Sequence, residues 1–202
     1  MKNILIVDYG MGNISSVKKA IKYLGHKPTV SSDFSEKDNF DFIVLPGVGS
    51  FENAMKNLQK NELDHIIREQ VIVKETPVLG ICLGMQLFAE MGTEPKVVKG
   101  LGLIKGIVTK MNLSNEFLPH IGRNDIQCKD NDFKEFDKKD FYFIHKYSLQ
   151  PENLSDILMT VEVQKKEFIA SIRNKNIFGT QFHPEKSQKD GLNLLKKIFS
   201  CK

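Results

Sequence analysis

The 202-residue sequence contains no tryptophan and only three cysteines, Cys82, Cys128 and Cys201. An odd number of widely spaced cysteines disfavours a disulfide framework or a zinc site and is typical of reduced thiols in an intracellular protein. The sequence also lacks a cluster of metal-ligating residues and a nucleotide-binding glycine fingerprint. We therefore expect neither a metal nor another cofactor.

Long apolar runs are missing as well. The N-terminal segment MKNILIVD has only four consecutive apolar residues before Asp8, so it predicts an opening strand and neither a signal peptide nor a membrane span. This pattern indicates a cytoplasmic protein that does not act at a membrane. The net charge of +4 is small and the lysine pairs are scattered along the chain, which argues against nucleic-acid binding.

A pattern typical of a nucleophilic thiol is present, however. Residues 80–84 read GICLG and follow the apolar run at 77–79. This is the cysteine form of a strand-to-helix elbow, in which glycines let the backbone take strained angles and expose one side chain. We expect a helix from Met85 to Met91 to aim its N-terminus at the Cys82 sulfur and favour the thiolate. A structural cysteine, buried between glycines that pack closely, would have the same sequence pattern.

A second pattern supplies a base for that thiol. Residues 179–187 read GTQFHPEKS, and Pro184 favours an extended or turning backbone between His183 and Glu185. His183 can then face a nucleophile while Glu185 orients the imidazole. Activation of a cysteine needs such a base, held by a third group. We therefore predict a catalytic triad of Cys82, His183 and Glu185.

A third pattern offers donors for an oxyanion. Residues 46–50, PGVGS, connect the apolar run 42–45 to a helix that opens at Phe51. Glycines in such a loop let backbone N–H groups approach a substrate closely. We expect backbone groups near Val48 and Leu83 to stabilise the oxyanion of an acyl-transfer reaction.

The order of apolar and amphipathic segments predicts the fold. Strands are expected at 4–8, 27–31, 42–45 and 77–81, with helices at 14–24 and, in one or two pieces, at 51–73. This alternation favours a parallel sheet with right-handed crossovers. After Gly100 the pattern becomes rich in strands, at 103–110, 141–145, 157–163, 168–173 and 177–181, before a helix at 191–199. The charged stretch 130–140 predicts a surface loop.

Taken together, PGVG, GICLGMQ and QFHPEKS resemble the class I glutamine amidotransferases. Further motifs, DYGMGN at 8–13, KGLGLI at 99–104, PHIG at 119–122 and FIHKY at 143–147, are similar to those of the glutaminase subunits of imidazole glycerol phosphate synthases. The resemblance covers essentially the whole chain. It implies one domain over residues 1–202 with a flavodoxin-like three-layer α/β/α sandwich, mostly parallel but with an antiparallel extension.

The resemblance also implies an activity, a substrate and a partner. Glutamine would be hydrolysed to glutamate and ammonia, and a (β/α)8-barrel cyclase subunit, bound as a heterodimer, would use the ammonia to make imidazole glycerol phosphate in histidine biosynthesis. The residues expected to form the oxyanion and glutamine pocket are Gly47, Val48, Gly49, Leu83, Gln86, Glu94, His145 and Tyr147. Those expected at the partner interface are Asn13, Arg123, Lys186 and Ser187.

Two departures from the family pattern leave the ammonia acceptor open. Arg123 stands in PHIGRN where the family usually has tryptophan, and Lys146 replaces a small hydroxyl residue. An arginine would suit a differently charged partner surface. The chain is then either a variant within the same complex or a paralogous subunit that supplies ammonia elsewhere, for example to a sugar nucleotide amidinated for cell-surface polysaccharide.

Other protein classes fit the sequence less well. A cysteine peptidase shares the elbow, but QFHPEK and the Met85-Gln86 pair argue against it. A flavodoxin-like binding module would have no need of the Cys82, His183 and Glu185 set. His120 reads equally well as a structural or as a functional histidine.

Overall fold

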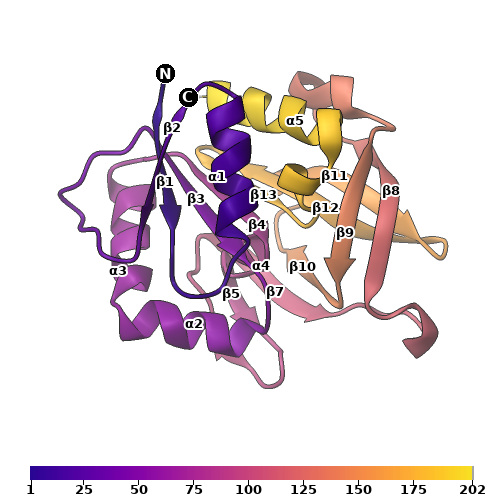
Figure 1. The fold of residues 1–202 in the computed structure, drawn as a ribbon. Helices are drawn as coiled ribbons and strands as arrows, with labels where there is room; N and C mark the ends of the chain where they lie inside the picture. Colours follow the sequence, from indigo (N-terminus) through magenta and orange to yellow (C-terminus); the bar gives the residue numbers. More distant parts are fainter. Residues whose placement is uncertain (202) are drawn as a thin grey trace.

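A nine-stranded mixed sheet forms the centre of the protein (Figure 1). The computed structural model describes residues 1–201. The strand order of the sheet is β2-β1-β3-β4-β13-β12-β11-β8-β9. The parallel half comprises β1 (Asn3–Val7), β2 (Lys27–Ser31), β3 (Phe42–Gly47), β4 (Val78–Cys82) and β13 (Ile177–Thr180). The antiparallel half comprises β12 (Lys166–Asn174), β11 (Ile157–Val163), β8 (His120–Cys128) and β9 (Asp140–His145). The predicted α/β fold, with a parallel sheet extended by antiparallel strands, is confirmed.

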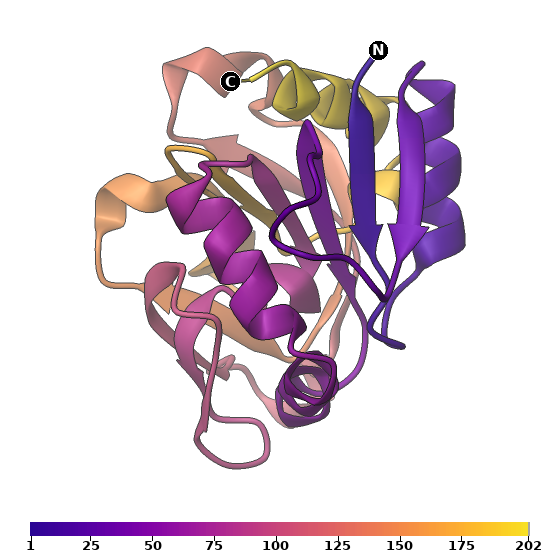
Figure 2. The ribbon, with the colours of Figure 1, turned by 90° about the vertical axis from the view of Figure 1, so that its left-hand side faces the viewer.

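Helices cover both faces of the parallel strands and complete three layers. Strand side chains alternate between the faces, so Ile4 and Ile6 pack with α1 (Ile14–Tyr23) and α5 (Gln188–Ser200). Leu5 and Val7 pack with α2 (Phe51–Lys60) and α3 (Leu63–Arg68), which continues into a π-helical turn at Glu69–Val73. In Figure 2, β1 and β2 stand between α1 and α3. The described helices include none long and apolar enough to cross a membrane.

A second, four-stranded sheet in the order β10-β7-β5-β6 adjoins the first. It contains β5 (Ala89–Gly92), β6 (Val98–Lys99), β7 (Ile104–Lys110) and β10 (Tyr147–Pro151). The helix predicted from Met85 to Met91 is therefore wrong, because the helix after Cys82, α4, spans only Leu83–Gln86. The carbonyls of Leu87 and Phe88, which a longer helix would use, instead accept hydrogen bonds from Leu101 and Leu103. Tertiary pairing with residues 101–104 thus ends the helix early.

The surface loop predicted at 130–140 is also not what forms. A 3-10 helix spans Asn131–Phe136, and its Phe133 and Phe136 are buried. Residues three apart lie on one side of a 3-10 helix, so the polar sequence carries two apolar anchors into the core. β9 then begins at Asp140, inside the predicted loop.

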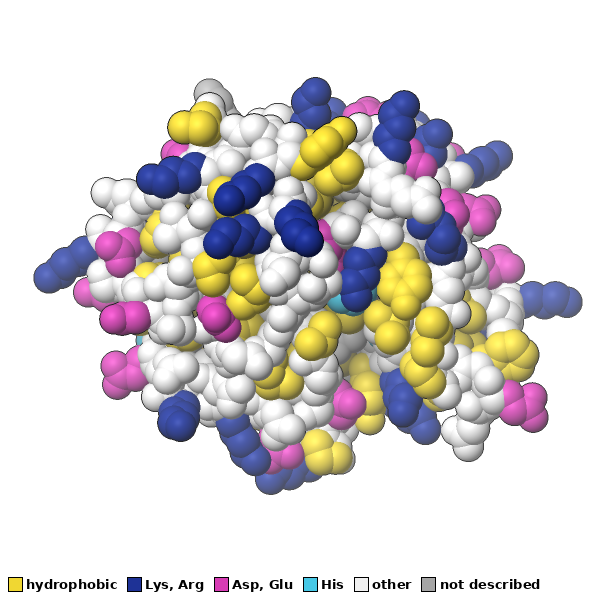
Figure 3. Space-filling view, viewed as in Figure 1, with side chains coloured by type: hydrophobic (Ala, Val, Ile, Leu, Met, Phe, Trp, Pro, Cys, Tyr) yellow, Lys and Arg dark blue, Asp and Glu magenta, His cyan; other side chains and the backbone are white. Residues whose placement is uncertain are grey.

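The charged side chains are distributed over the surface. On the face shown in Figure 3, several lysine and arginine side chains lie close together in the upper half of the view, and others are dispersed among carboxylates and uncharged groups.

Candidate active site

Cys82 lies at a strained elbow between β4 and α4. Its backbone angles are φ 55° and ψ −110°, a positive φ that is uncommon outside glycine and is tolerated where the surrounding structure enforces it. Gly84 permits the turn, because a Cβ atom there would lie 1.8 Å from the carbonyl oxygen of Leu45 on the neighbouring strand. Glycine at this position lets the start of α4 sit directly against β3. The elbow holds the Cys82 side chain at the edge of the sheet with 6% of the residue exposed.

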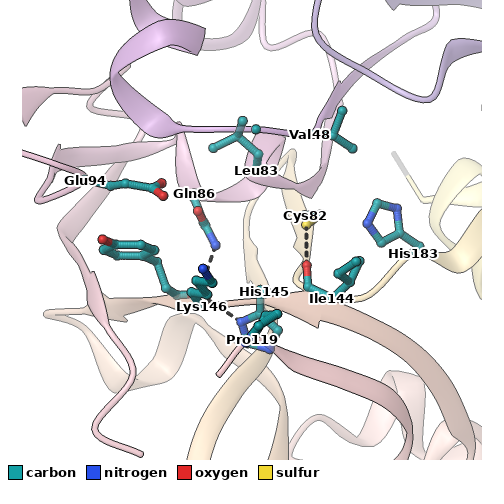
Figure 4. Close-up of a pocket in the computed structure, with 12 residues that line it drawn as sticks. Val48, Cys82, Leu83, Gln86, Glu94, Pro119, Ile144, His145, Lys146 and His183 are labelled. Carbon is teal, nitrogen blue, oxygen red and sulfur yellow. Dashed lines mark hydrogen bonds between the residues drawn. The ribbon is translucent and has the colours of Figure 1, made fainter. Parts of the chain in front are cut away.

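His183 and Glu185 form a buried pair beside Cys82. Nδ1 of His183 lies 2.8 Å from Oε1 of Glu185, with 2% and 1% of the two side chains exposed. The carboxylate oxygen of Glu185 accepts this hydrogen bond, so Nδ1 of His183 carries a proton. Nε2, the other ring nitrogen, points away from Glu185. Nε2 is buried without a hydrogen-bond partner in the described part of the chain, and Figure 4 shows the ring next to Cys82. His183 is thus placed to exchange a proton with the thiol or with a ligand.

The electrostatics of His183 favour an ion pair with the thiolate. Burial alone would lower the pKa of the His183 imidazole, but its proximity to the Cys82 sulfur and its hydrogen bond to Glu185, reinforced by the charges of both groups, outweigh burial and raise the pKa to about 9. The imidazolium therefore persists at neutral pH. A cationic imidazole is the partner that a cysteine nucleophile requires.

Strand register explains why the three predicted motifs meet. β13 runs parallel to β4 with Thr180 opposite Ile81, so the chain delivers His183 just beyond the end of β4. β3 pairs with β4 as far as Gly47 opposite Cys82, which brings the glycine loop to the thiol. The carboxyl ends of parallel strands share one edge of the sheet, and ligands of open α/β sheets bind there.

A cavity of about 320 Å³ opens at this edge, within the size range of small-molecule sites. Its lining includes Cys82 and His183 together with seven of the eight residues expected around glutamine, namely Val48, Gly49, Leu83, Gln86, Glu94, His145 and Tyr147 (Figure 4). The eighth, Gly47, lies behind the lining, where a Cβ atom would come within 2.7 Å of the backbone nitrogen of Gly84. Pro119 and Ile144 also line the cavity and were not predicted. Lys146, noted in the sequence only as a departure, lines it too.

The glycine loop is anchored at both ends. The buried Tyr9 hydroxyl donates to the carbonyl of Pro46 at 2.8 Å, and burial raises the pKa of that hydroxyl, so it stays protonated. On the other side, the N–H of Phe51, at the start of α2, donates to Oε2 of Glu94 at 3.2 Å. A carboxylate is favoured at a helix N-terminus. The sequence did not single out Tyr9 as an anchor, although it belongs to the DYGMGN motif.

The four residues predicted at a partner interface occupy different positions. Arg123 forms an ion pair of 2.7 Å with Asp140, and the Lys186 ammonium lies 6.0 Å from the centre of the Tyr142 ring. Ser187 is fully buried, and its hydroxyl donates to the His183 carbonyl at 2.7 Å. Ser187 therefore lies below the surface, where its hydrogen bond helps to fix the backbone of His183. Asn13 is half-buried and its carbonyl accepts from the N–H of Val17 in α1.

The described part of the chain also bears on whether a metal centre is present. No three His, Cys, Asp or Glu side chains of residues 1–201 group as a metal site would. Cys128 and Cys201 are free thiols outside the cavity.

Comparison with known proteins defines the class to which this fold and site belong. The family model for class I glutamine amidotransferases matches residues 5–200, and the chain belongs to that family. A solved structure described as PurLQS from Thermotoga maritima has the same fold, with a TM-score of 0.76 and 19% sequence identity over 98% of each chain.

More similar relatives belong to one kind of enzyme. The chain is 41% identical to the imidazole glycerol phosphate synthase subunit HisH of Methanopyrus kandleri, over 98% of this chain and 97% of the relative. It is 43% identical to the subunit of the same name from Aquifex aeolicus, over 96% of this chain and 94% of that protein.

Proposed function

We propose that this protein is the glutaminase subunit of an imidazole glycerol phosphate synthase, which hydrolyses glutamine and passes the ammonia to a cyclase subunit in histidine biosynthesis. The observation that carries the proposal is the buried His183–Glu185 pair facing Cys82 on its elbow, in a chain whose relatives of about 41% identity bear that name. We propose that the chain forms one domain, acts in the cytoplasm and needs no cofactor for glutamine hydrolysis.

The first half of the mechanism forms a thioester. The Cys82 thiolate attacks the side-chain carboxamide carbon of glutamine, and backbone N–H groups near Val48 and Leu83 stabilise the oxyanion. The carbon–nitrogen bond then breaks while Nε2 of His183 gives its proton to the leaving nitrogen. Ammonia departs, a glutamyl thioester remains on Cys82, and His183 is left neutral.

The second half releases glutamate. Neutral His183 takes a proton from water at Nε2 as the water oxygen attacks the thioester carbon. The carbon–sulfur bond breaks, which restores the Cys82 thiolate and the imidazolium. Glu185 stabilises the imidazolium and fixes the ring, because its Oε1 accepts the Nδ1 proton throughout.

The cavity offers acceptors for the amino-acid end of glutamine. We assign Glu94 as acceptor for the α-ammonium group, since its carboxylate lines the cavity and only one oxygen is used by Phe51. Gln86, His145 and Tyr147 also line the cavity. These groups would orient the substrate so that its carboxamide meets Cys82.

Ammonia needs shelter on its way to the acceptor, because in water at neutral pH it is mostly ammonium. We propose that a (β/α)8-barrel cyclase subunit docks over the cavity. Ile121 and Ile144 face each other across β8 and β9 and are 56% and 39% exposed, and Asn13, Arg123 and Lys186 would contribute polar contacts. Because Arg123 is already paired with Asp140, it adds little unbalanced charge in place of the usual tryptophan. This pairing favours the histidine-pathway partner over one of different charge.

Reconstitution with the cyclase subunit from the same organism tests the proposal. We expect a heterodimer that converts amide-labelled [15N]glutamine into 15N-labelled imidazole glycerol phosphate, with glutamate release stimulated when the cyclase ligand is bound. If the two proteins neither associate nor couple glutamine hydrolysis to cyclisation, the histidine assignment is wrong. Transfer of the label to a sugar nucleotide with a different partner would identify the paralogous role instead.

A further inference from the structure

Gln181 is a fully buried polar residue that the mechanism above does not use. Its Nε2 lies 3.7 Å from the sulfur of Cys82, within the range of an N–H to sulfur hydrogen bond. Its Oε1 lies 2.9 Å from Nε2 of Gln86. Gln181 therefore connects the nucleophile to Gln86, a second side chain that lines the cavity.

The direction of these hydrogen bonds is fixed by a backbone carbonyl. The carbonyl oxygen of Tyr147 only accepts, so the atom of Gln86 that lies 3.0 Å from it is the donor Nε2. The second hydrogen on this nitrogen goes to Oε1 of Gln181. With its oxygen held there, Gln181 turns its own nitrogen toward Cys82. Both hydrogens of the Gln86 amide are used inside the protein, and only its oxygen remains for a ligand.

Two histidines extend the same chain of hydrogen bonds. Nδ1 of His145 lies 2.9 Å from the Tyr147 carbonyl and must carry a proton, so its Nε2 accepts from Nδ1 of His120 at 3.0 Å. Burial lowers the pKa of His145 to about 3 and also lowers that of His120. Both rings are then neutral at pH 7, and one proton on each satisfies the two contacts.

At the outer end of this chain, Nε2 of His120 in β8 carries no proton, because the one proton of the neutral ring is on Nδ1, and it lies 2.8 Å from the side-chain amide of Asn124. Arg123, its neighbour in sequence, is one of the residues assigned above to the partner interface. The hydrogen-bonded chain therefore leads from that part of β8 to the sulfur of Cys82.

We propose that Gln181 is a catalytic residue that donates an N–H to the Cys82 sulfur, and that Gln86 and His145 are positioning residues that hold this donor in place. The inference deepens the proposed function, since it concerns how the same site stabilises its thiolate. The sulfur is anionic before attack and again when it leaves the thioester. His183 gives up and regains a proton during the cycle, whereas the amide of Gln181 is neutral and keeps its N–H throughout. The Gln181 N–H can therefore stabilise the charge on the sulfur at both moments.

The test measures thiol reactivity and needs neither glutamine nor a partner. Iodoacetamide alkylation of Cys82 in the purified chain is followed by peptide mass spectrometry between pH 5 and 10, in wild type, Gln181→Met, Gln86→Met and the double variant. Methionine keeps the length and apolar bulk but donates no hydrogen bond. Gln150→Met, at an exposed position in β10, is the matched control.

We expect Gln181→Met to move the midpoint of the alkylation profile upward by about one pH unit, which is about tenfold slower alkylation below the midpoint. Gln86→Met should give a smaller upward shift, although residue 86 does not touch the sulfur, and the double variant should equal Gln181→Met, because Gln86 acts through Gln181. Gln150→Met should behave as wild type.

Unchanged midpoints in both single variants overturn the proposal, even if the height of the profile changes with access to the cavity. Additive shifts in the double variant overturn the positioning role of Gln86. Should Gln181→Met fail to fold, Gln86→Met alone decides, by a raised or an unchanged midpoint. Because alkylation reports the thiol directly, these outcomes stay distinct from a failure of glutamine hydrolysis or of cyclisation.

Discussion

Replacing Cys82 by alanine is expected to lower glutamine hydrolysis by about four orders of magnitude or more, since no other group near the cavity can form the thioester. The Cys82 side chain is small and lies at the edge of the sheet, so the fold should survive its truncation. In the complex with the cyclase, cyclisation driven by added ammonia should continue at its wild-type rate, because the ammonia bypasses Cys82. Glutamate release and cyclisation, measured separately, check both expectations.

The matched control for this substitution is Cys201→Ala. Cys201 is a half-buried free thiol outside the cavity, and glutamine hydrolysis should be unaffected by its loss. Wild-type glutamate release from Cys82→Ala in the complex would rule out the nucleophile assigned here.

Glu185→Gln is expected to have the second-largest effect, a loss of about 10³ to 10⁴ in kcat for glutamine hydrolysis. The amide has the size of the carboxylate but no charge, and it can present N–H to Nδ1 of His183, which favours the wrong tautomer. The buried 2.8 Å contact has no solvent to take over the role. Glutamate release at saturating glutamine measures this loss, with the exposed Glu162→Gln in β11 as control.

The pH dependence of glutamine hydrolysis by the wild-type enzyme should reflect the raised pKa of His183 beside Glu185. The pKa of His183 is raised to about 9, so the imidazolium that protonates the leaving nitrogen is present below that pH and is lost as the pH rises through it. We expect hydrolysis to fall off above pH 9, and the residual activity of Glu185→Gln to fall off at lower pH. A high-pH limb that does not move in the variant would contradict the role of Glu185 in holding the proton.

Residues at strand ends are those that the sequence locates well. The elbow, the glycine loop and QFHPE each follow a strand of the parallel sheet, so local patterns are enough to place Cys82, His183 and Val48 at one edge. The strands at 27–31 and 157–163 have the predicted limits, because each is bounded by polar or glycine-rich segments. Here local propensity and tertiary pairing agree.

Features that depend on contacts between distant segments could not be read from the sequence. The early end of α4 is imposed by residues 101–104, which take the carbonyls a longer helix would use. The charged sequence of residues 130–140 predicts an exposed segment, but in the fold Phe133 and Phe136 are buried in the core. Polar pairs such as His120 with His145 join residues 25 apart on antiparallel strands, and neither residue type signals its partner.

Gln181 shows the limit most clearly. It belongs to the QFHPEKS motif, yet its neighbour His183 attracts the chemical role in the sequence, because glutamine has no titratable group. Only the fold shows that Gln181 lies between Cys82 and Gln86, residues 99 and 95 positions away in the chain. Spacing along one strand could not have indicated this contact.

The central claim, that Cys82 is the nucleophile which attacks glutamine, is tested most directly by covalent labelling of the complex with diazo-oxo-norleucine, a glutamine-directed electrophile. Mass spectrometry should find one adduct, on Cys82, with Cys128 and Cys201 unmodified and labelling slowed by glutamine. Labelling of another residue, or equal labelling with and without glutamine, would contradict the assignment.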